Sequence, residues 1–372
     1  MLAALRSALR SSTAPGLVLV GSALVPTSLS AQEEASPFPS PEEYAARAEA
    51  AERAPLFSAH EPLVLTLRTD IKWLRDKRPN EEEVEGVVVL EGPDGATTLA
   101  VDVRTRGNFR RDPRNCNFPP LRLDFPTKQV EGTVFEGQDK LKLVTPCHDS
   151  RDNFQQYVLQ EYLAYRTYNL LTPVGYRVRL VHITYEDVNQ KYDTRTKTAF
   201  LIESDEAMAA RNRATISVWE AFHPLRLDNE QASVMALFQY MIGNTDWSAV
   251  YFHNSVLIRR EDGVFLPIPY DFDFAGVVNA RYATPDPQLS IRDVRERLFR
   301  GFCREGTDHE ALKERFHAQH TSIRDLYVGM AELEDGQRKR ALEYYDKFYE
   351  TLDNPGRYER EILRPCLEVP TD

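Results

Sequence analysis

Residues 243–276 read GNTDWSAVYFHNSVLIRREDGVFLPIPYDFDFAG, and this stretch holds the polar side chains on which the interpretation of the whole chain depends. A helix-like apolar segment precedes it, and Gly243 is placed to end that helix. Within the stretch, two short apolar runs, residues 256–258 and 264–269, predict a β-hairpin. Such a hairpin would bring Asn254, which precedes its first strand, next to Asp271 and Asp273, which follow its second strand.

These polar residues predict a phosphoryl-transfer site. Two carboxylates and one amide oxygen suit a hard cation, typically Mg²⁺ shared with substrate phosphates. Asp246 lies in the loop after the predicted helix and is placed to orient or deprotonate a hydroxyl. One aspartate on the nucleophile, with asparagine and aspartate on the metal, is the division of labour in phosphoryl transfer. The alternative is structural, since aspartate often caps backbone N–H groups in turns.

The rest of the second half is mainly helical. Polar residues precede an apolar stripe in residues 229–242, while 308–333 and 335–352 are long amphipathic stretches with Glu and Lys or Arg four residues apart. We therefore expect residues 205–372 to form a helical lobe that carries the catalytic and metal loops.

Residues 59–204 have a mostly strand-like pattern with one helix. The strand-like segments are 63–69, 87–90, 97–103, 121–125, 141–144, 176–185 and 198–202. Residues 153–171 have helical spacing instead. Together with the helical second half, this pattern predicts an α+β fold of two lobes: a β-rich N-terminal lobe with one main helix, followed by a helical C-terminal lobe.

The beginning of the chain differs from the rest. Residues 1–31 contain Arg6 and Arg10 but no acidic residue, and an apolar stretch and small residues then lead to Ala31. This order is typical of a secretory signal peptide, so we expect cleavage near Ala31 and a periplasmic or secreted protein. Residues 32–58 are expected to form a polar leader and a helix. No second long apolar segment follows, so the mature chain is expected to have no transmembrane anchor.

The composition excludes several classes of protein. The 372 residues include 46 Lys and Arg against 57 Asp and Glu, a formal net charge of -11, and 42% of them are hydrophobic. Enough apolar residues are present to bury a core, which excludes an intrinsically disordered chain. The acidic balance argues against nucleic-acid binding, because that function needs a basic surface.

The four cysteines are widely spaced and form no CxxC motif. Zinc sites use closely spaced pairs, so disulfides are favoured in an exported protein. Four cysteines allow three connectivities. We expect Cys116–Cys147 and Cys303–Cys366, because each pair lies within one half of the chain. Free buried thiols are the alternative.

The segments GNTDWS, HN and YDFDFAG resemble the catalytic and metal loops of atypical kinases of the CotH (spore-coat) and HipA type. Residues 103–108 (VRTRGN) resemble the RGN element of the CotH family, and residues 140–143 (KLKL) resemble the strand that follows it. The similarity covers roughly residues 60 to 276. It implies a two-lobed protein-kinase-like fold and a phosphotransferase that uses ATP with Mg²⁺ or Mn²⁺.

The resemblance also implies a role for each matching residue. Asp246 would be the catalytic aspartate, and Asn254 with Asp271 or Asp273 would ligate Mg²⁺. Three residues would lie over the nucleotide: Arg106, Gly107 and Asn108. Lys142, or less favourably Lys140, would hold the phosphates of ATP, and Glu161 would pair with Lys142.

The charged residues of the first half have structural interpretations as well. Five arginines between residues 104 and 114 form either a solvated loop or a local anion site. Lys140 and Lys142 alternate on a strand, and both could simply face solvent. Glu161 could pair with Arg166 or Arg177 rather than with a lysine.

Two classes of function follow from these expectations. The favoured one is an exported kinase-like phosphotransferase that moves the γ-phosphate of ATP to the hydroxyl of an unknown protein or small-molecule acceptor. The alternative is a non-catalytic pseudokinase that acts as an extracytoplasmic surface or scaffold protein. Asn254 follows Asp246 by eight residues rather than the five of conventional kinases, no GxGxxG loop is present, and ATP is scarce outside the cytoplasm. A metal-dependent phosphoesterase is a third option.

Overall fold

The computed structural model describes residues 38–92 and 95–370. The predicted signal peptide and its cleavage position lie outside the described residues. The first element is the predicted helix, α1 (Pro41–Arg53). It begins with a capping box, in which Glu43 N–H donates to Ser40 Oγ at 3.2 Å and Ser40 N–H donates to the Glu43 carboxylate at 2.7 Å.

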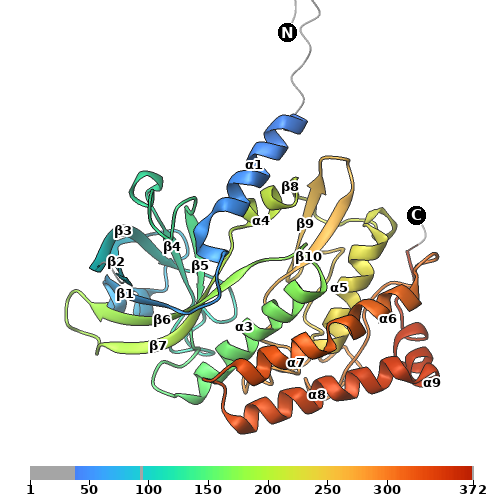
Figure 1. The fold of residues 1–372 in the computed structure, drawn as a ribbon. Coiled ribbons are helices and arrows are strands. Elements are labelled where there is room, and N and C mark those ends of the chain that lie inside the picture. The colour runs from blue at the N-terminus through green and yellow to red at the C-terminus, as the bar shows by residue number, and fades with distance from the viewer. Residues whose placement is uncertain (1–37, 93–94, 371–372) are drawn as a thin grey trace, which may run out of the picture. The chain divides into compact units, whose positions relative to one another are not determined.

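Seven strands close into a barrel in the order β1-β2-β3-β4-β5-β7-β6 (Figure 1). Neighbouring strands are antiparallel except β1 and β6, which pair in parallel, with Leu63 opposite Val181 and Thr69 opposite Asp187. The strands are β1 (Leu63–Thr69), β2 (Val84–Gly92), β3 (Gly95–Thr105), β4 (Leu121–Asp124), β5 (Lys140–Val144), β6 (Val178–Asp187) and β7 (Arg195–Ile202).

Alternate residues of these strands fill the barrel. In β1, Leu65 and Leu67 are fully buried while Val64 is half exposed. Neighbouring residues of a strand point to opposite faces, so this alternation places one face of each strand in the interior. Helix α2 (Ile71–Lys77) follows β1 and buries two apolar side chains in the same core.

The second half contains a three-stranded antiparallel sheet as well as helices. The sheet has the order β10-β9-β8, from β8 (Ala214–Ser217), β9 (Ser255–Arg260) and β10 (Phe265–Pro269). The remaining helices are α3 (Asn153–Leu171), α4 (Asp205–Arg211), α5 (Asn229–Ile242), α6 (His309–Ala318), α7 (His320–Gly329), α8 (Asp335–Asp353) and α9 (Pro355–Tyr358), which continues into a π-helical turn (Glu359–Leu363). Single 3₁₀ turns occur at Pro55–Phe57, Thr127–Gln129 and Pro224–Arg226.

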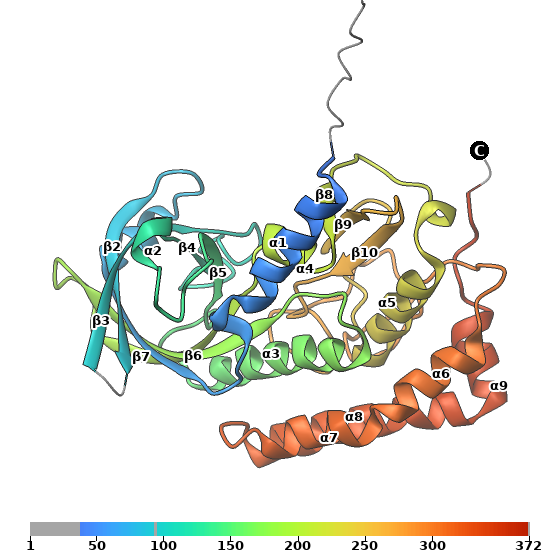
Figure 2. The same cartoon turned by 45° about the horizontal axis from the view of Figure 1, so that its top comes forward.

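Helix α3 joins the barrel to the rest of the molecule. It packs on β6 and β7 on one side and on α5 and α7 on the other, with α6 to α9 forming an outer layer (Figure 2). Its central residues, among them Leu163, Ala164 and Tyr165, are buried. One hydrophobic core therefore extends from the ends of β5 and β7 through α3 to the C-terminal helices.

The predicted two-lobed protein-kinase-like fold, with a β-rich N-terminal lobe and a helical C-terminal lobe, is wrong. The first half is a closed, mixed seven-stranded barrel, and the second half includes a sheet of its own. The barrel closes through β1 and β6, where facing residues such as Arg68 and Glu186 are 118 positions apart in the chain. An alternating pattern shows which face of a strand is buried, but it does not show which strand is its neighbour.

Individual elements were predicted more successfully than their arrangement. The strand at residues 63–69 and the helices at 153–171 and 229–242 begin and end where predicted. The long helix expected over 308–333 is instead divided into α6 and α7 at Gln319, whose backbone has φ -98° and ψ 0°. Four short elements, α2, α4, β8 and α9, were missed.

Both expected disulfides are confirmed. Cys116 pairs with Cys147 and Cys303 with Cys366, with Cα atoms 4.7 and 5.0 Å apart. Such bonds are compatible with an extracytoplasmic protein, because disulfides persist in oxidising compartments. Among the helices of residues 38–92 and 95–370, none is long and apolar enough to cross a membrane.

Candidate functional site

A cavity of about 400 Å³, called the polar cavity below, lies where the loop after β3, helix α3, the loop after α5 and the turn after β10 meet. It brings together every predicted site residue except Lys142. Those residues are Arg106, Gly107, Asn108, Glu161, Asp246, Asn254, Asp271 and Asp273. Asp246, Asn254, Asp271 and Asp273 therefore line one cavity, whereas Lys142 does not.

The predicted hairpin positions Asn254 and Asp271. Strands β9 and β10 pair with Ser255 opposite Pro269, and Tyr270 N–H donates to Asn254 O at 3.0 Å. Asn254 and Asp271 lie just beyond the two paired ends, with φ values of 48° and 62°. Asn and Asp tolerate this left-handed conformation better than most residues, which explains the residue types at both positions.

Asp246 is held by two neighbours from its own loop. His253 Nε2 lies 2.7 Å from one carboxylate oxygen, and Asn254 Nδ2 donates to the other at 3.0 Å and to Asp246 O at 2.8 Å. The loop begins at Gly243, which ends α5 with φ 68°. A Cβ at Gly243 would overlap the hydroxyl of Tyr344, so glycine is required there for both conformation and space.

The buried guanidinium of Arg110 is the central positive charge of the polar cavity. Its Nη1 lies 3.8 Å from Glu161 Oε2 and 3.9 Å from Asp273 Oδ2, and its Nη2 donates to Thr145 O. The Tyr282 hydroxyl donates to the same Asp273 oxygen at 3.0 Å. Glu161 therefore pairs with Arg110, and the pairings with Lys142, Arg166 or Arg177 weighed from the sequence are not observed.

Burial and neighbouring charges shift the pKa values of the carboxyl groups around Arg110. Burial, together with the charge of Asp271, raises the pKa of Asp273. Burial and the charges of Asp273 and Asp271 likewise raise the pKa of Glu161. Arg110 opposes both shifts and Arg106 also opposes that of Glu161, but these cations do not compensate three neighbouring carboxylates. Perturbed titration of this kind is common at functional sites.

Lys142 is not among the residues that line the polar cavity. Its ammonium group donates to Asp205 Oδ1 at 2.6 Å and lies 5.3 and 5.4 Å from the ring centres of Tyr176 and Tyr270. Burial lowers the pKa of Lys142, while the charge of Asp205 opposes that effect. Tyr270, one of the two rings beside this lysine, lines the polar cavity.

The loop after β3 contributes both charge and backbone groups. Gly107 has φ 79°, a left-handed conformation that favours glycine, and its carbonyl accepts from Arg111 Nε at 2.9 Å. Arg106 N–H is bonded to Pro120 O at 3.0 Å, which anchors the start of the loop. Phe109 packs edge-on against Phe274 with ring centres 5.1 Å apart, which joins this loop to the turn after β10.

In the part of the chain that the structure describes, no group of three or more His, Cys, Asp or Glu side chains is arranged to hold a metal ion. The expected metal residues include two carboxylates, Asp271 and Asp273, and one amide, Asn254. Such a set matches Mg²⁺ sites in which phosphates and water supply the other ligands, rather than a cage made of protein alone.

No family model matches this chain, and no curated protein matches it either. The resemblance to CotH-type kinases therefore stays a prediction.

Sequence reasoning missed Arg110 and Tyr165, which line the polar cavity, and Tyr282, which donates to Asp273. Arg110 was only one of five clustered arginines, and nothing in the sequence shows which of them turns inward. Tyr165 accepts the Asp271 N–H at 2.8 Å, and Tyr282 binds Asp273. Tyr165 lies four residues after Glu161 on the same helix, a spacing that places both on one face and could have indicated it.

Proposed function

We propose that the polar cavity is the active site of a phosphotransferase that moves the γ-phosphate of ATP to a hydroxyl of a protein or small-molecule acceptor. The observation that carries this proposal is the placement of Asp246, whose carboxylate is held by two neighbours in the same cavity as Asp271 and Asp273. One carboxylate is thereby available for the acceptor hydroxyl, and a separate pair for the phosphate side.

Each residue type suits one part of this reaction. Asp246 would take the proton of the acceptor hydroxyl while the hydroxyl oxygen bonds to the γ-phosphorus and the bond from that phosphorus to the ADP oxygen breaks. Arg106 and the backbone N–H groups of Gly107 and Asn108 line the same cavity and would bind phosphate oxygens.

Asn254, Asp271 and Asp273 are the residues that would hold Mg²⁺ or Mn²⁺. Their chemistry fits a hard cation, because carboxylate and amide oxygens are its preferred ligands. Burial and the charge of Asp271 raise the pKa of Asp273, and a cation bound between these carboxylates would compensate their charge. Bound there, the ion would neutralise charge that develops on the transferred phosphate.

We further propose that the chain is exported through a signal peptide cleaved near Ala31 and acts in the periplasm or outside the cell. The basic, apolar and small-residue order of residues 1–31 supports this assignment. The two disulfides agree with it.

Nucleotide-dependent thermal stabilisation tests the binding part of the proposal. With ATP and Mg²⁺ at about 100 times the dissociation constant, the protein should gain roughly 2.7 kcal/mol. Asp271→Asn should remove this gain while preserving the left-handed backbone, because asparagine tolerates that conformation. Asp262→Asn, in the turn of the same hairpin and outside the polar cavity, is the matched control and should leave the gain unchanged.

Release of ADP and transfer of labelled γ-phosphate to protein or water test the chemical part. We expect turnover that falls at least about 10²-fold in Asp246→Asn, since general-base groups contribute 10²- to 10⁴-fold. Absence of any stabilisation by nucleotide with either metal would contradict the proposal. Stabilisation that depends on Asp271 but comes without turnover would instead support the non-catalytic alternative.

A further inference from the structure

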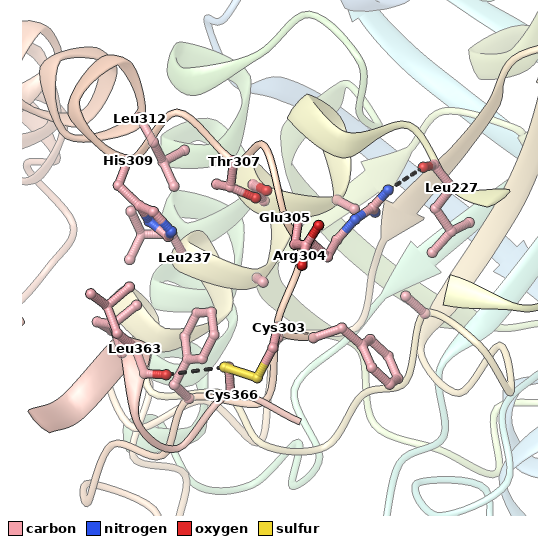
Figure 3. A pocket seen from close by; sticks show the side chains of 18 of the residues that line it. Leu227, Leu237, Cys303, Arg304, Glu305, Thr307, His309, Leu312, Leu363 and Cys366 are labelled. Carbon is pink, nitrogen blue, oxygen red and sulfur yellow. Dashed lines mark hydrogen bonds between the residues drawn. A yellow bond between two sulfur atoms is a disulfide. The ribbon is translucent and has the colours of Figure 1, made fainter. Parts of the chain in front are cut away.

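A second cavity of about 400 Å³, called the apolar pocket below, lies between α5, the start of α6 and the segment that follows Phe299 (Figure 3). Apolar side chains dominate its walls, among them Leu237 from α5, Leu312 from α6 and Leu363 from the π-helical turn. In Figure 3 the side chains of His309 and Leu312 face across the pocket toward the segment from Cys303 to Thr307.

The disulfide Cys303–Cys366 forms part of this wall. Next to it, Cys303 N–H donates to Leu367 O, and Leu367 N–H donates to Gly301 O, both at 2.8 Å. The C-terminal segment is thereby tied to the strand-like segment at residues 301–303. These bonds give the pocket a wall that is present without a ligand, as expected for a preformed site.

The loop that carries Asp246 also borders the apolar pocket. Trp247 and Ala249 line the apolar pocket, whereas Asp246, His253 and Asn254 line the polar cavity. A ligand in the apolar pocket would therefore touch the same loop that positions Asp246.

One polar group of the apolar pocket is suited to contact a ligand. His309 Nδ1 lies 2.9 Å from the Tyr358 hydroxyl, which has no other hydrogen-bond partner among the described residues. Burial raises the pKa of Tyr358 to about 12, so the hydroxyl keeps a proton that it can donate to Nδ1. Burial lowers the pKa of His309, which favours the neutral ring. In the tautomer whose Nδ1 accepts from this hydroxyl, the ring proton sits on Nε2, which can donate to a ligand.

The positively charged group of the pocket, Arg304, already has hydrogen-bond partners. Arg304 donates from Nη2 to Leu227 O at 2.6 Å and from Nη1 to Asp228 O at 3.4 Å. Glu305, an exposed residue, also lines the pocket and adds a negative charge. An anionic ligand would gain little from this arrangement, so the pocket suits an uncharged molecule.

We propose that the apolar pocket binds a small uncharged molecule that has an apolar body and one carbonyl-type hydrogen-bond acceptor, with the acceptor placed against His309 Nε2. Concave, mainly apolar sites with one or two polar groups are the usual form of small-molecule sites. The proposal does not depend on the phosphotransferase assignment, because it rests on the walls of a different cavity.

A matched pair of probes tests the proposal on the full, disulfide-bonded chain. 2-Acetylnaphthalene carries a carbonyl acceptor, and 2-ethylnaphthalene has nearly the same shape without it. Saturation-transfer NMR should detect both probes on the protein, and titration should give about two- to tenfold tighter binding of the acetyl compound, the value of one hydrogen bond. In His309→Leu the two affinities should become equal.

Variants that fill the apolar pocket distinguish binding in this pocket from non-specific binding elsewhere on the protein. Ala232→Phe fills the pocket from α5 and should abolish binding of both probes. Ala210→Phe makes the same change at another half-buried helical alanine, which lines neither cavity, and should bind normally. If Ala232→Phe fails to fold, Leu363→Trp at the 39% exposed rim provides a second block.

Two results would overturn the proposal. One is the absence of a signal from both probes with the unmodified protein. The other is probe binding that survives both Ala232→Phe and Leu363→Trp, which would place the probes elsewhere. Equal affinities of the two probes for the unmodified protein would contradict the role of His309.

Discussion

The polar cavity and the apolar pocket share one loop, yet different forces hold them together. In the polar cavity, the buried guanidinium of Arg110 lies within 4 Å of Glu161 and Asp273. In the apolar pocket, side-chain packing and the Cys303–Cys366 disulfide form the walls. Charges in a buried site depend on one another, so loss of one leaves the others uncompensated. Apolar walls are more independent, since each side chain contributes mainly through its own buried area.

The shared loop shows how closely the two environments are joined. Asp246 and Trp247 are neighbours in the chain, but they line different cavities. Asp246 is 40% exposed in its side chain, whereas Trp247 is 5% exposed as a residue. Burial of the tryptophan anchors the loop, and this anchor leaves the aspartate free to face the polar cavity.

The largest effect on stability should come from removing the cation of the polar cavity. Arg110→Met should lower the free energy of unfolding by about 3–5 kcal/mol, because Glu161 and Asp273 would remain buried without a compensating charge. Chemical denaturation measures the change. Adding Glu161→Gln and Asp273→Asn should recover part of the loss. Arg114→Met, at an exposed arginine of the same cluster, is the control and should have little effect.

Replacing the glycine at the start of the shared loop should affect both cavities. Gly243→Ala is expected to cost about 3 kcal/mol, because alanine is strained at φ 68° and its Cβ would overlap the Tyr344 hydroxyl. Adding Tyr344→Phe removes the overlapping oxygen and should restore part of the stability, as measured by denaturation. An undiminished loss in the double variant would show that steric overlap is not the cause.

Removing the disulfide Cys303–Cys366 should affect ligand binding in the apolar pocket but not in the polar cavity. Cys303→Ser combined with Cys366→Ser should lower the free energy of unfolding by about 2–3 kcal/mol, because the unfolded chain gains conformational freedom. Binding of 2-acetylnaphthalene should weaken, while the stabilisation by ATP and Mg²⁺ should persist. An equal loss of binding for both ligands would show that the shared loop transmits the loss of the disulfide to the polar cavity, so that the two cavities are not independent.

The smallest effect on stability should come from the aspartate with the proposed catalytic role. Asp246→Asn removes a partly exposed interaction with His253, which is worth less than about 1 kcal/mol. Phosphoryl transfer should nevertheless fall by the 10²-fold or more expected above. A stability loss as large as that of Arg110→Met would indicate that Asp246 has a structural role instead.

The local features of this protein were determined by its sequence. Alternation and helical spacing predicted β1, α3 and α5 with their ends, because these patterns depend on near neighbours in the chain. The hairpin between Asn254 and Asp271 followed from two adjacent apolar runs. Eight of the nine predicted site residues accordingly line one cavity.

Only the tertiary structure decided what depends on distant contacts. The barrel closes through the parallel pairing of β1 and β6, which no local pattern specifies and which makes the expected two-lobed fold wrong. The same holds for charge pairs: Arg110 rather than Lys142 compensates Glu161, because the loop after β3 turns one of five similar arginines inward. Side-chain direction and strand neighbours are set by packing among remote residues, and packing energies are summed over the whole core, not along the chain.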